Sequence, residues 1–271
     1  MKKVAITTDS SCCIPQELVS KYDIYVLPLL IIYGDKSYRD GIDMSPNEVY
    51  RIMRKREELP TTSIPSAGDF LEAYRQLSKK AESILCVTVS AQLSKTFDTA
   101  LLAKEMAKDE IPNTAIEVID SRSVAGGLGF IVLEAAKAAK EGADLAQVAE
   151  AARNMMPRIN LIGTASAWMG SVLSIKPIIE VPTTTGVVEA VERARTKPKA
   201  VKRLLEIMAE RVGESPVHVI VHHAGVPEEG EELKARVASQ FNCVELYLTE
   251  FTPAMGVHTG PGLLGIAFYA D

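Results

Sequence analysis

Three clusters of hydroxyl and acidic residues each follow an apolar, β-branched run in the first half of this sequence. They are Thr7–Ser11, Thr88–Ser94 and Asp120–Ser123. If the runs are parallel strands, the carboxyl ends of these strands share one edge of a sheet, where open α/β proteins bind ligands beside helix N-termini. The edge is therefore suited to holding the oxygen atoms of an anionic or polar group.

A fourth hydroxyl cluster, Thr61–Ser63, precedes Pro65 and can join the same edge. Two interpretations are open for Ser66, Ser94 and Ser123, because each also stands where a helix is expected to begin. As N-caps, they would each stabilise a helix by about 1 kcal/mol. As ligand contacts, they would place hydroxyl groups around one bound group.

No reaction motif accompanies these clusters: the sequence has no phosphate loop, no Gly-x-Ser-x-Gly elbow and no His-Glu-x-x-His pair. His258 is a candidate functional residue because it lies in the Gly-rich stretch Gly256–Gly262, and such loops often carry function. An alternative is a hydrolase or acyltransferase with Ser94 as nucleophile, His258 as base and Asp9 or Asp120 as the orienting carboxylate. That triad requires contact in space.

Two other segments favour structural roles. Neighbouring side chains of a strand point to opposite faces, so His222 and His223 are not expected to hold one metal ion. The stretch Gly126–Gly129 departs from the Gly-x-Gly-x-x-Gly pattern, and its small residues favour close packing of a helix against a sheet. No metal site and no cofactor are expected. Reduced thiols are expected for the cysteines, namely Cys12, Cys13, Cys86 and Cys243.

The first half alternates strand-like runs with helical periodicity, which predicts a parallel, Rossmann-like sheet with helices on both faces. The expected strands are Lys3–Thr8, Ile24–Ile32, Ser83–Val89 and Thr114–Ile119. The expected helices are Pro46–Glu57, Ala67–Lys80, Lys95–Lys108, Val124–Glu141 and Leu145–Met156.

The regular alternation changes character at Pro157, so we expect two domains, 1–156 and 157–271. The second is predicted to be a mixed α/β domain. Its expected strands are Ile159–Thr164, Val187–Val191, Val217–Val221 and Val244–Leu248, and its expected helices are Pro198–Arg211 and Glu229–Phe241.

Composition excludes several classes of function. With 47% hydrophobic residues in 271, the chain can bury two cores, whereas its formal net charge of -5 provides no basic field for nucleic acid. The most apolar runs, 24–33 and 162–181, are too short or too interrupted to span a bilayer. Thr8 and Asp9 come too early for a secretory signal, so we expect a cytoplasmic protein.

An ordered series of short motifs along nearly the whole chain resembles the DegV family. The motifs are Thr8-Asp9-Ser10-Ser11, Tyr38-Arg39-Asp40-Gly41, Thr62-Ser63-Ile64-Pro65-Ser66, Leu93-Ser94-Lys95-Thr96, Ile119-Asp120-Ser121, Ile175-Lys176-Pro177-Ile178 and His258-Thr259-Gly260-Pro261-Gly262. The resemblance implies a two-domain DegV-like α/β fold. It also implies a non-catalytic protein that encloses a long-chain fatty acid such as palmitate, with the carboxylate between the domains and the tail in an apolar tunnel.

Family members include the acyl-binding subunit of bacterial fatty-acid kinase, which presents the acyl group to a separate ATP-using subunit. By this resemblance, Thr62 and Ser94 donate hydrogen bonds to the carboxylate, His258 joins that network and Ser63 is a further candidate. Arg195 matches the family's basic segment, where it is either a partner contact or a solvated charge.

The sequence departs from the family pattern in three places. Ile64 replaces Gln and Lys95 replaces Gly, while the hydroxyl residues stay. The family's Leu-x-x-Gly-Gly-Arg-Ile segment is missing before the Ile-Lys-Pro motif, which is expected to change the tunnel rim or a docking surface. Tail binding and core packing are both open for one apolar series, namely Ala165, Ala167, Trp168, Met169, Val172, Leu173, Ile175, Ile178 and Ile179.

Overall fold

The protein is an α/β structure with three sheets, and the computed structural model describes residues 2–55, 58–164 and 176–271. The first sheet is parallel throughout, as the sequence predicted, and its strand order is β2-β1-β6-β7. Its strands are β1 (Lys2–Asp9), β2 (Tyr25–Leu27), β6 (Ala81–Thr88) and β7 (Ala115–Asp120). The parallel arrangement and three of the four predicted strands are thereby confirmed.

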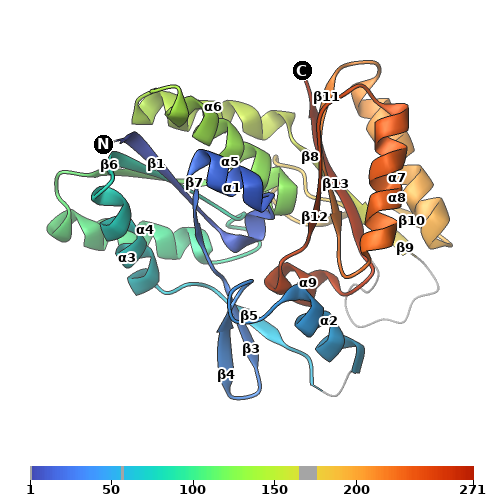
Figure 1. Cartoon of the computed structure of the whole chain (residues 1–271), viewed down its shortest axis with the longest axis horizontal. Coiled ribbons are helices and arrows are strands. Elements are labelled where there is room, and N and C mark those ends of the chain that lie inside the picture. The colour runs from blue at the N-terminus through green and yellow to red at the C-terminus, as the bar shows by residue number, and fades with distance from the viewer. Residues whose placement is uncertain (1, 56–57, 165–175) are drawn as a thin grey trace.

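Helices cover both faces of the parallel sheet (Figure 1). Alternate residues of β6 separate the two layers: Ile84 and Cys86 pack with one group of helices, whereas Leu85 and Val87 pack with the other. The first group is α3 (Ala67–Ser78) and α4 (Thr96–Glu110). The second is α1 (Gln16–Tyr22), α5 (Ala125–Lys140) and α6 (Leu145–Met155), with the short turns η1 (Ser10–Cys12) and η2 (Met156–Arg158) nearby.

The second sheet is mixed, with the order β10-β9-β8-β13-β11-β12, and only its β11–β12 pair is parallel. Its outer face packs against α7 (Lys197–Val212) and α8 (Pro227–Gln240), while its inner face turns towards α5. The strands are β8 (Asn160–Thr164), β9 (Lys176–Glu180), β10 (Glu189–Ala194), β11 (Val217–His223), β12 (Cys243–Glu250) and β13 (Leu264–Ala270). The predicted mixture of helices and strands in the second half of the chain is confirmed.

The predicted single strand Ile24–Ile32 is wrong, because the chain breaks at Pro28 and its two parts enter different sheets. Proline has no N–H for a sheet ladder, and the amide of Leu29 instead donates to the Ser10 hydroxyl at 3.0 Å. Beyond the break, β3 (Leu30–Tyr33) forms a small antiparallel sheet with β4 (Lys36–Arg39) and β5 (Thr61–Ser63).

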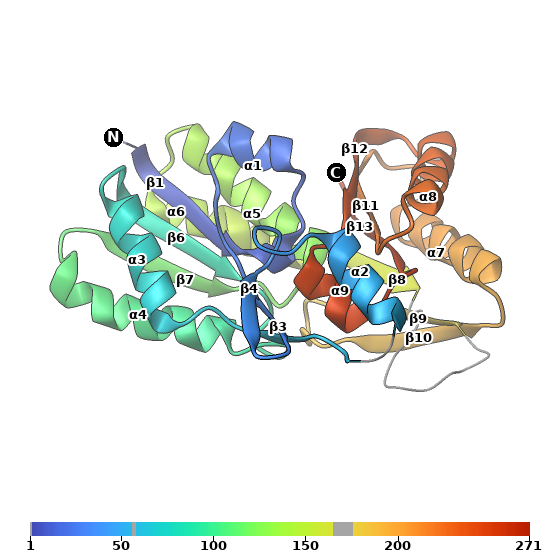
Figure 2. The same cartoon turned by 60° about the horizontal axis from the view of Figure 1, so that its bottom comes forward.

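Two helices connect this small sheet to the second half of the chain. Figure 2 shows α2 (Pro46–Lys55) beside α9 (Pro253–Thr259), and the two are in contact. The Gly-rich stretch around His258 was predicted to be a loop, but its first residues belong to α9, whose C-cap residue is Gly260. The sequence interpretation also missed β13, which lies in the middle of the second sheet.

Helix α5 packs between the two large sheets, and its glycines permit that contact. A Cβ at Gly126 would lie 2.7 Å from the Cβ of Ala267 in β13, and one at Gly129 would lie 2.8 Å from the carbonyl oxygen of Cys12. The predicted packing role of Gly126–Gly129 is therefore confirmed. A single hydrophobic cluster therefore extends from the first sheet through α5 to the second sheet. It contains Ile6 of β1, Ile131 of α5 and Ile220 of β11.

His222 fastens α5 to the second sheet. Its Nε2 atom accepts a hydrogen bond from the Gly126 amide at 3.0 Å, so the proton lies on Nδ1, which donates to the Thr249 hydroxyl at 2.7 Å. Full burial lowers the pKa of His222 to about 3, so the ring stays neutral at pH 7. This is a structural role, as the sequence suggested.

The chain passes from the first sheet to the second between α6 and β8, near the expected boundary at residue 157. The division into two domains stays a prediction, because α2 and the small sheet belong to the first half in sequence yet contact α9. Within the described residues, no helix combines the length and the apolar character needed to cross a membrane.

We expect the variant Gly126→Ala to lower the free energy of unfolding by about 1–3 kcal/mol, because the added methyl group has no room between α5 and β13. Urea unfolding followed by circular dichroism measures the change. Gly68→Ala in α3 is the control, because a Cβ there would meet only the Ser66 hydroxyl at 3.5 Å. Equal stability of the two variants would contradict the close packing of α5.

Candidate functional site

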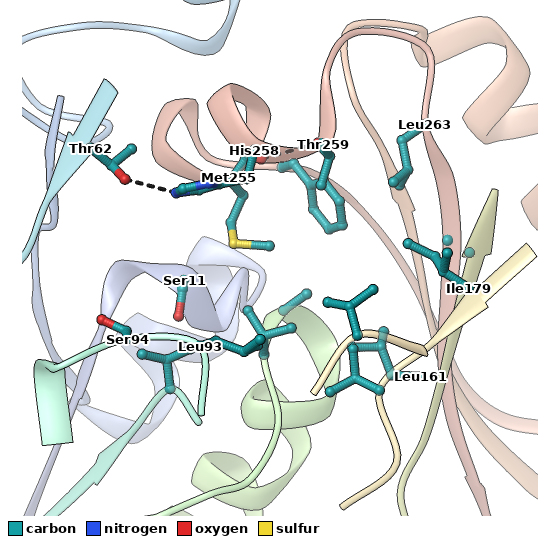
Figure 3. A pocket seen from close by; sticks show the side chains of 18 of the residues that line it. Ser11, Thr62, Leu93, Ser94, Leu161, Ile179, Met255, His258, Thr259 and Leu263 are labelled. Atoms are coloured by element: carbon teal, nitrogen blue, oxygen red, sulfur yellow. Dashed lines mark hydrogen bonds between the residues drawn. The ribbon is translucent and has the colours of Figure 1, made fainter. Parts of the chain in front are cut away.

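A cavity of about 660 Å³ lies where the three sheets meet. Its volume is within the range of roughly 300–1,000 Å³ found for small-molecule sites. Figure 3 shows the hydroxyl groups of Thr62 and Ser94 towards one side of the cavity, and the side chains of Leu161 and Ile179 towards the other. The cavity therefore has a polar end and an apolar end.

Thr62 and His258 meet at the polar end although they are 196 residues apart: the Oγ1 atom of Thr62 lies 2.7 Å from Nε2 of His258 (Figure 3). Thr62 is the middle residue of β5, where it pairs with Ile31 of β3. His258 lies in the last turn of α9. Ser63, the next residue along β5, also lines the cavity.

Ser94 lines the same cavity from the loop between β6 and α4. Its Oγ atom accepts a hydrogen bond from the Thr96 amide at 3.2 Å and lies 2.7 Å from the Thr96 hydroxyl. All four predicted site residues, Thr62, Ser63, Ser94 and His258, therefore line one cavity. That they bind a carboxylate stays a prediction.

The N-cap interpretation holds for one serine and fails for another. Ser66 caps α3 through a reciprocal capping box with Asp69. Ser123 is not a cap, because α5 begins after Val124, and the Ser123 hydroxyl is buried without a hydrogen-bond partner. Ser94 stands one residue before the N-cap position of α4, Lys95.

The acidic residues at the sheet edge hold loops together. Asp9 accepts hydrogen bonds from the Val89 amide at 2.8 Å and from the Ser11 hydroxyl at 2.5 Å. Asp120 accepts from the amides of Ala91 and Arg122. The predicted shared edge is confirmed by these bonds between neighbouring strand ends, and burial raises the pKa of Asp9.

Asp40 positions the helix that carries His258, a role that sequence reasoning missed. Its carboxylate accepts a hydrogen bond from the Ser10 hydroxyl at 2.5 Å and from the Ala254 amide in the first turn of α9 at 2.8 Å. Tyr50 of α2 adds to this support, because its buried ring lies against Gly256 of α9. Asp40 belongs to the motif Tyr38-Arg39-Asp40-Gly41, but nothing in the sequence indicated its contact with α9.

Ser11 also lines the cavity and was not among the predicted site residues. Ser11 belongs to the hydroxyl and acidic cluster Thr7–Ser11, so its position after a predicted strand could have indicated a place in the site. Its hydroxyl proton is directed to Asp9. Ser11 can therefore accept a hydrogen bond from a ligand more readily than it can donate one.

The apolar end draws on the second sheet, on α9 and on the residue that precedes β13. Its lining includes Leu161, Ile179, Met255 and Leu263. Of the expected tail residues, Ile179 lines the cavity, whereas Ile178 is buried in the core behind the second sheet. The other expected tail residues fall within 165–175, outside the described residues.

The His258 ring is accessible from the cavity but has protein around it. This desolvation lowers the pKa of His258 below its ordinary value of 6.5, so the ring is neutral at pH 7. Glu180 lines the cavity too, and the Arg211 guanidinium pairs with it at 2.6 Å. The described part of the chain contains no group of three or more His, Cys, Asp or Glu residues that could hold a metal ion.

Arg195 lies away from the cavity lining, exposed between β10 and α7. That position leaves both interpretations of Arg195 open. His223, the neighbour of His222, points to the other side of β11, against Gly230 of α8.

We expect the His258 ring to titrate below pH 6.5 in the NMR spectrum of the folded protein. Because burial disfavours the charged ring, the unfolded chain takes up this proton first as the pH falls below 6.5, and the contribution of His258 to folding stability declines with it. The variant His258→Gln assigns the signal, and urea-unfolded protein gives the reference midpoint. A midpoint at or above the reference would contradict a desolvated, neutral ring.

Comparison with known proteins gives matches along the whole chain. The model of the DegV family ("Uncharacterised protein, DegV family") matches residues 3–271. A DegV domain-containing protein of Clostridium acetobutylicum is 34% identical over an alignment 285 residues long, and the alignment covers 99% of this chain and 99% of the relative.

Two solved structures share the fold. A DegV family protein from Thermus thermophilus, whose structure concerns fatty acid binding, has a TM-score of 0.88 and 27% identity, with 100% of each chain covered. DegV from Bacillus subtilis, a fatty acid binding protein, has a TM-score of 0.90 and 26% identity, again with 100% of each chain covered. With these matches over its full length, the chain belongs to the DegV family.

Proposed function

We propose that this protein binds one long-chain fatty acid, with the carboxyl group at Thr62, Ser94 and His258 and the tail in the apolar end of the cavity. The observation that carries the proposal is the polarity of the cavity, which has hydroxyl and imidazole groups at one end and aliphatic side chains at the other. The fatty acid binding of the Thermus thermophilus and Bacillus subtilis relatives supports it.

Simple energetics favour an acyl ligand in such a cavity. Each buried methylene group contributes about 0.8 kcal/mol, so a chain of more than a dozen carbons provides ample gross binding energy without a covalent bond. The carboxyl group opposes binding, because burial without partners costs several kcal/mol. Thr62 and Ser94 offset that cost by hydrogen bonding to its oxygen atoms.

The described hydrogen bonds do not favour the alternative of a serine hydrolase. A triad needs Ser94 bonded to His258 and His258 bonded to a carboxylate. The bonds of Ser94 go to Thr96, while His258 bonds to Thr62. Asp9 and Asp120 are occupied by backbone amides. A carrier that leaves its ligand unchanged fits this arrangement better.

We further propose that the protein presents the bound acyl group to a separate, ATP-using fatty-acid kinase subunit. The resemblance to the acyl-binding subunit of such kinases supports this role. A carrier that holds the carboxyl group by noncovalent contacts keeps it chemically free for phosphorylation by another subunit. We assign Arg195 as a partner contact, because it is exposed and lies apart from the cavity.

Native mass spectrometry of protein purified without added lipid should show about one acyl chain per monomer.

In a binding assay with palmitate, Thr62→Val should weaken affinity about tenfold, since a hydrogen bond to a charged group is worth at least about 1.5 kcal/mol. Ser94→Ala should act in the same direction. Thr61→Val is the control, because Thr61 is also in β5 but does not line the cavity. If a double variant that combines Thr62→Val and Ser94→Ala binds palmitate with full affinity, the carboxyl site is refuted.

With palmitate-loaded protein and a purified ATP-using kinase subunit, acyl phosphate should form and can be trapped with hydroxylamine. Arg195→Glu should reduce the rate several-fold while palmitate affinity stays unchanged, because the substitution reverses a charge at the proposed interface. Lys79→Glu, at the far end of α3, is the charge-matched control. If Arg195→Glu and Lys79→Glu react at the rate of the unchanged protein, Arg195 is not a partner contact.

A further inference from the structure

The charged and titratable side chains around the cavity leave one cation without a buried partner. Among the described lining residues, these side chains are Lys95, Glu180 and His258. Arg211 pairs with Glu180 at 2.6 Å, and His258 is neutral at pH 7 because it is desolvated. Lys95 therefore carries the one lining positive charge at neutral pH within the described chain.

Lys95 forms an exposed ion pair with Asp98. Its ammonium group lies 3.1 Å from the Asp98 carboxylate, and the two side chains are 78% and 57% exposed. An ion pair this exposed contributes little to stability and is easily rearranged. Its ammonium group can therefore turn to another anion at little cost.

The position of Lys95 relates it directly to the polar end. It follows Ser94 in the chain and is the N-cap residue of α4, and both residues line the cavity. Hydroxyl groups and a neutral imidazole form hydrogen bonds with acids, alcohols and esters alike. A fixed positive charge distinguishes among them, because it stabilises only the ionised acid.

We propose that Lys95 is a specificity-determining residue that makes this protein select the ionised carboxylate over neutral lipids with the same tail. The inference rests on the proposed fatty-acid function and deepens it. On binding, the ammonium group turns from Asp98 towards the carboxylate held by Thr62 and Ser94. The interaction is partly exposed to solvent, so it weakens as salt is added.

Titration of delipidated protein with palmitate and with 1-hexadecanol tests this role. At pH 8 and low salt, Lys95→Gln should weaken palmitate binding about tenfold, equivalent to about 1.4 kcal/mol, and change hexadecanol binding less than about twofold. Lys95→Arg should retain the affinity for palmitate. Lys108→Gln is the matched control, because Lys108 lies in α4 and, like Lys95, pairs with a carboxylate three residues away.

A second readout follows the ligand itself. The carboxyl carbon of palmitate labelled with carbon-13 should titrate about one pH unit higher in Lys95→Gln than in the unchanged protein, the shift that corresponds to the same tenfold loss. High salt should reduce the palmitate affinity of the unchanged protein more than that of the variant. A merely structural role of Lys95 would not move the titration of the ligand.

The outcomes separate the two proposals. If the unchanged protein binds neither palmitate nor hexadecanol, the fatty-acid function itself fails. If it binds palmitate, but Lys95→Gln binds with the same affinity, salt dependence and ligand titration, only the role of Lys95 fails. Equal losses for palmitate and hexadecanol would also overturn it. Melting temperatures verify that each variant is folded.

Discussion

The close packing of α5 between the two large sheets is the constraint on which the rest of the structure depends. Gly126 and Gly129 bring the helix within contact of β13 on one side and of the turn after β1 on the other. The distance between the sheets is thereby set by a helix backbone. Since Val124 and Ala125 at the start of α5 line the cavity, the same packing forms part of its wall.

The polar end is assembled from segments that have no local reason to meet. Thr62 comes from a small antiparallel sheet, Ser94 from a strand-to-helix loop and His258 from a seven-residue helix near the end of the chain. Asp40 joins the first and last of these regions, because it accepts a hydrogen bond from the amide of Ala254. Asp40 does not line the cavity, yet it helps to determine where the imidazole of His258 lies.

Periodicity predicted most of the regular elements, and its errors have physical causes. Pro28 divides an apolar run that looks like one continuous strand. Because proline has no N–H to donate to a neighbouring strand, the run splits into β2 and β3. Strand β13 was missed because it follows a Gly-rich stretch and contains the small residues Gly265 and Ala267, of which Ala267 lies against Gly126 of α5. The hydroxyl clusters contain Thr62 and Ser94, and the resemblance to the DegV family selected these two residues from them. The contact of Thr62 with His258 depends on tertiary packing that one sequence does not reveal.

The hydrogen bonds of Ser94 and Thr62 to their protein neighbours are compatible with donation by both hydroxyl groups to a bound carboxylate, the group that the proposed function places there. The Ser94 oxygen accepts from the Thr96 amide, and if the Thr96 hydroxyl also donates to it, the Ser94 proton is free for a ligand. Likewise, a His258 ring protonated on Nε2 donates to Thr62 and leaves the Thr62 proton free. A bound carboxylate, which only accepts, selects both arrangements at once. Two hydroxyl donors then point at one ligand because their neighbours have taken the accepting sites.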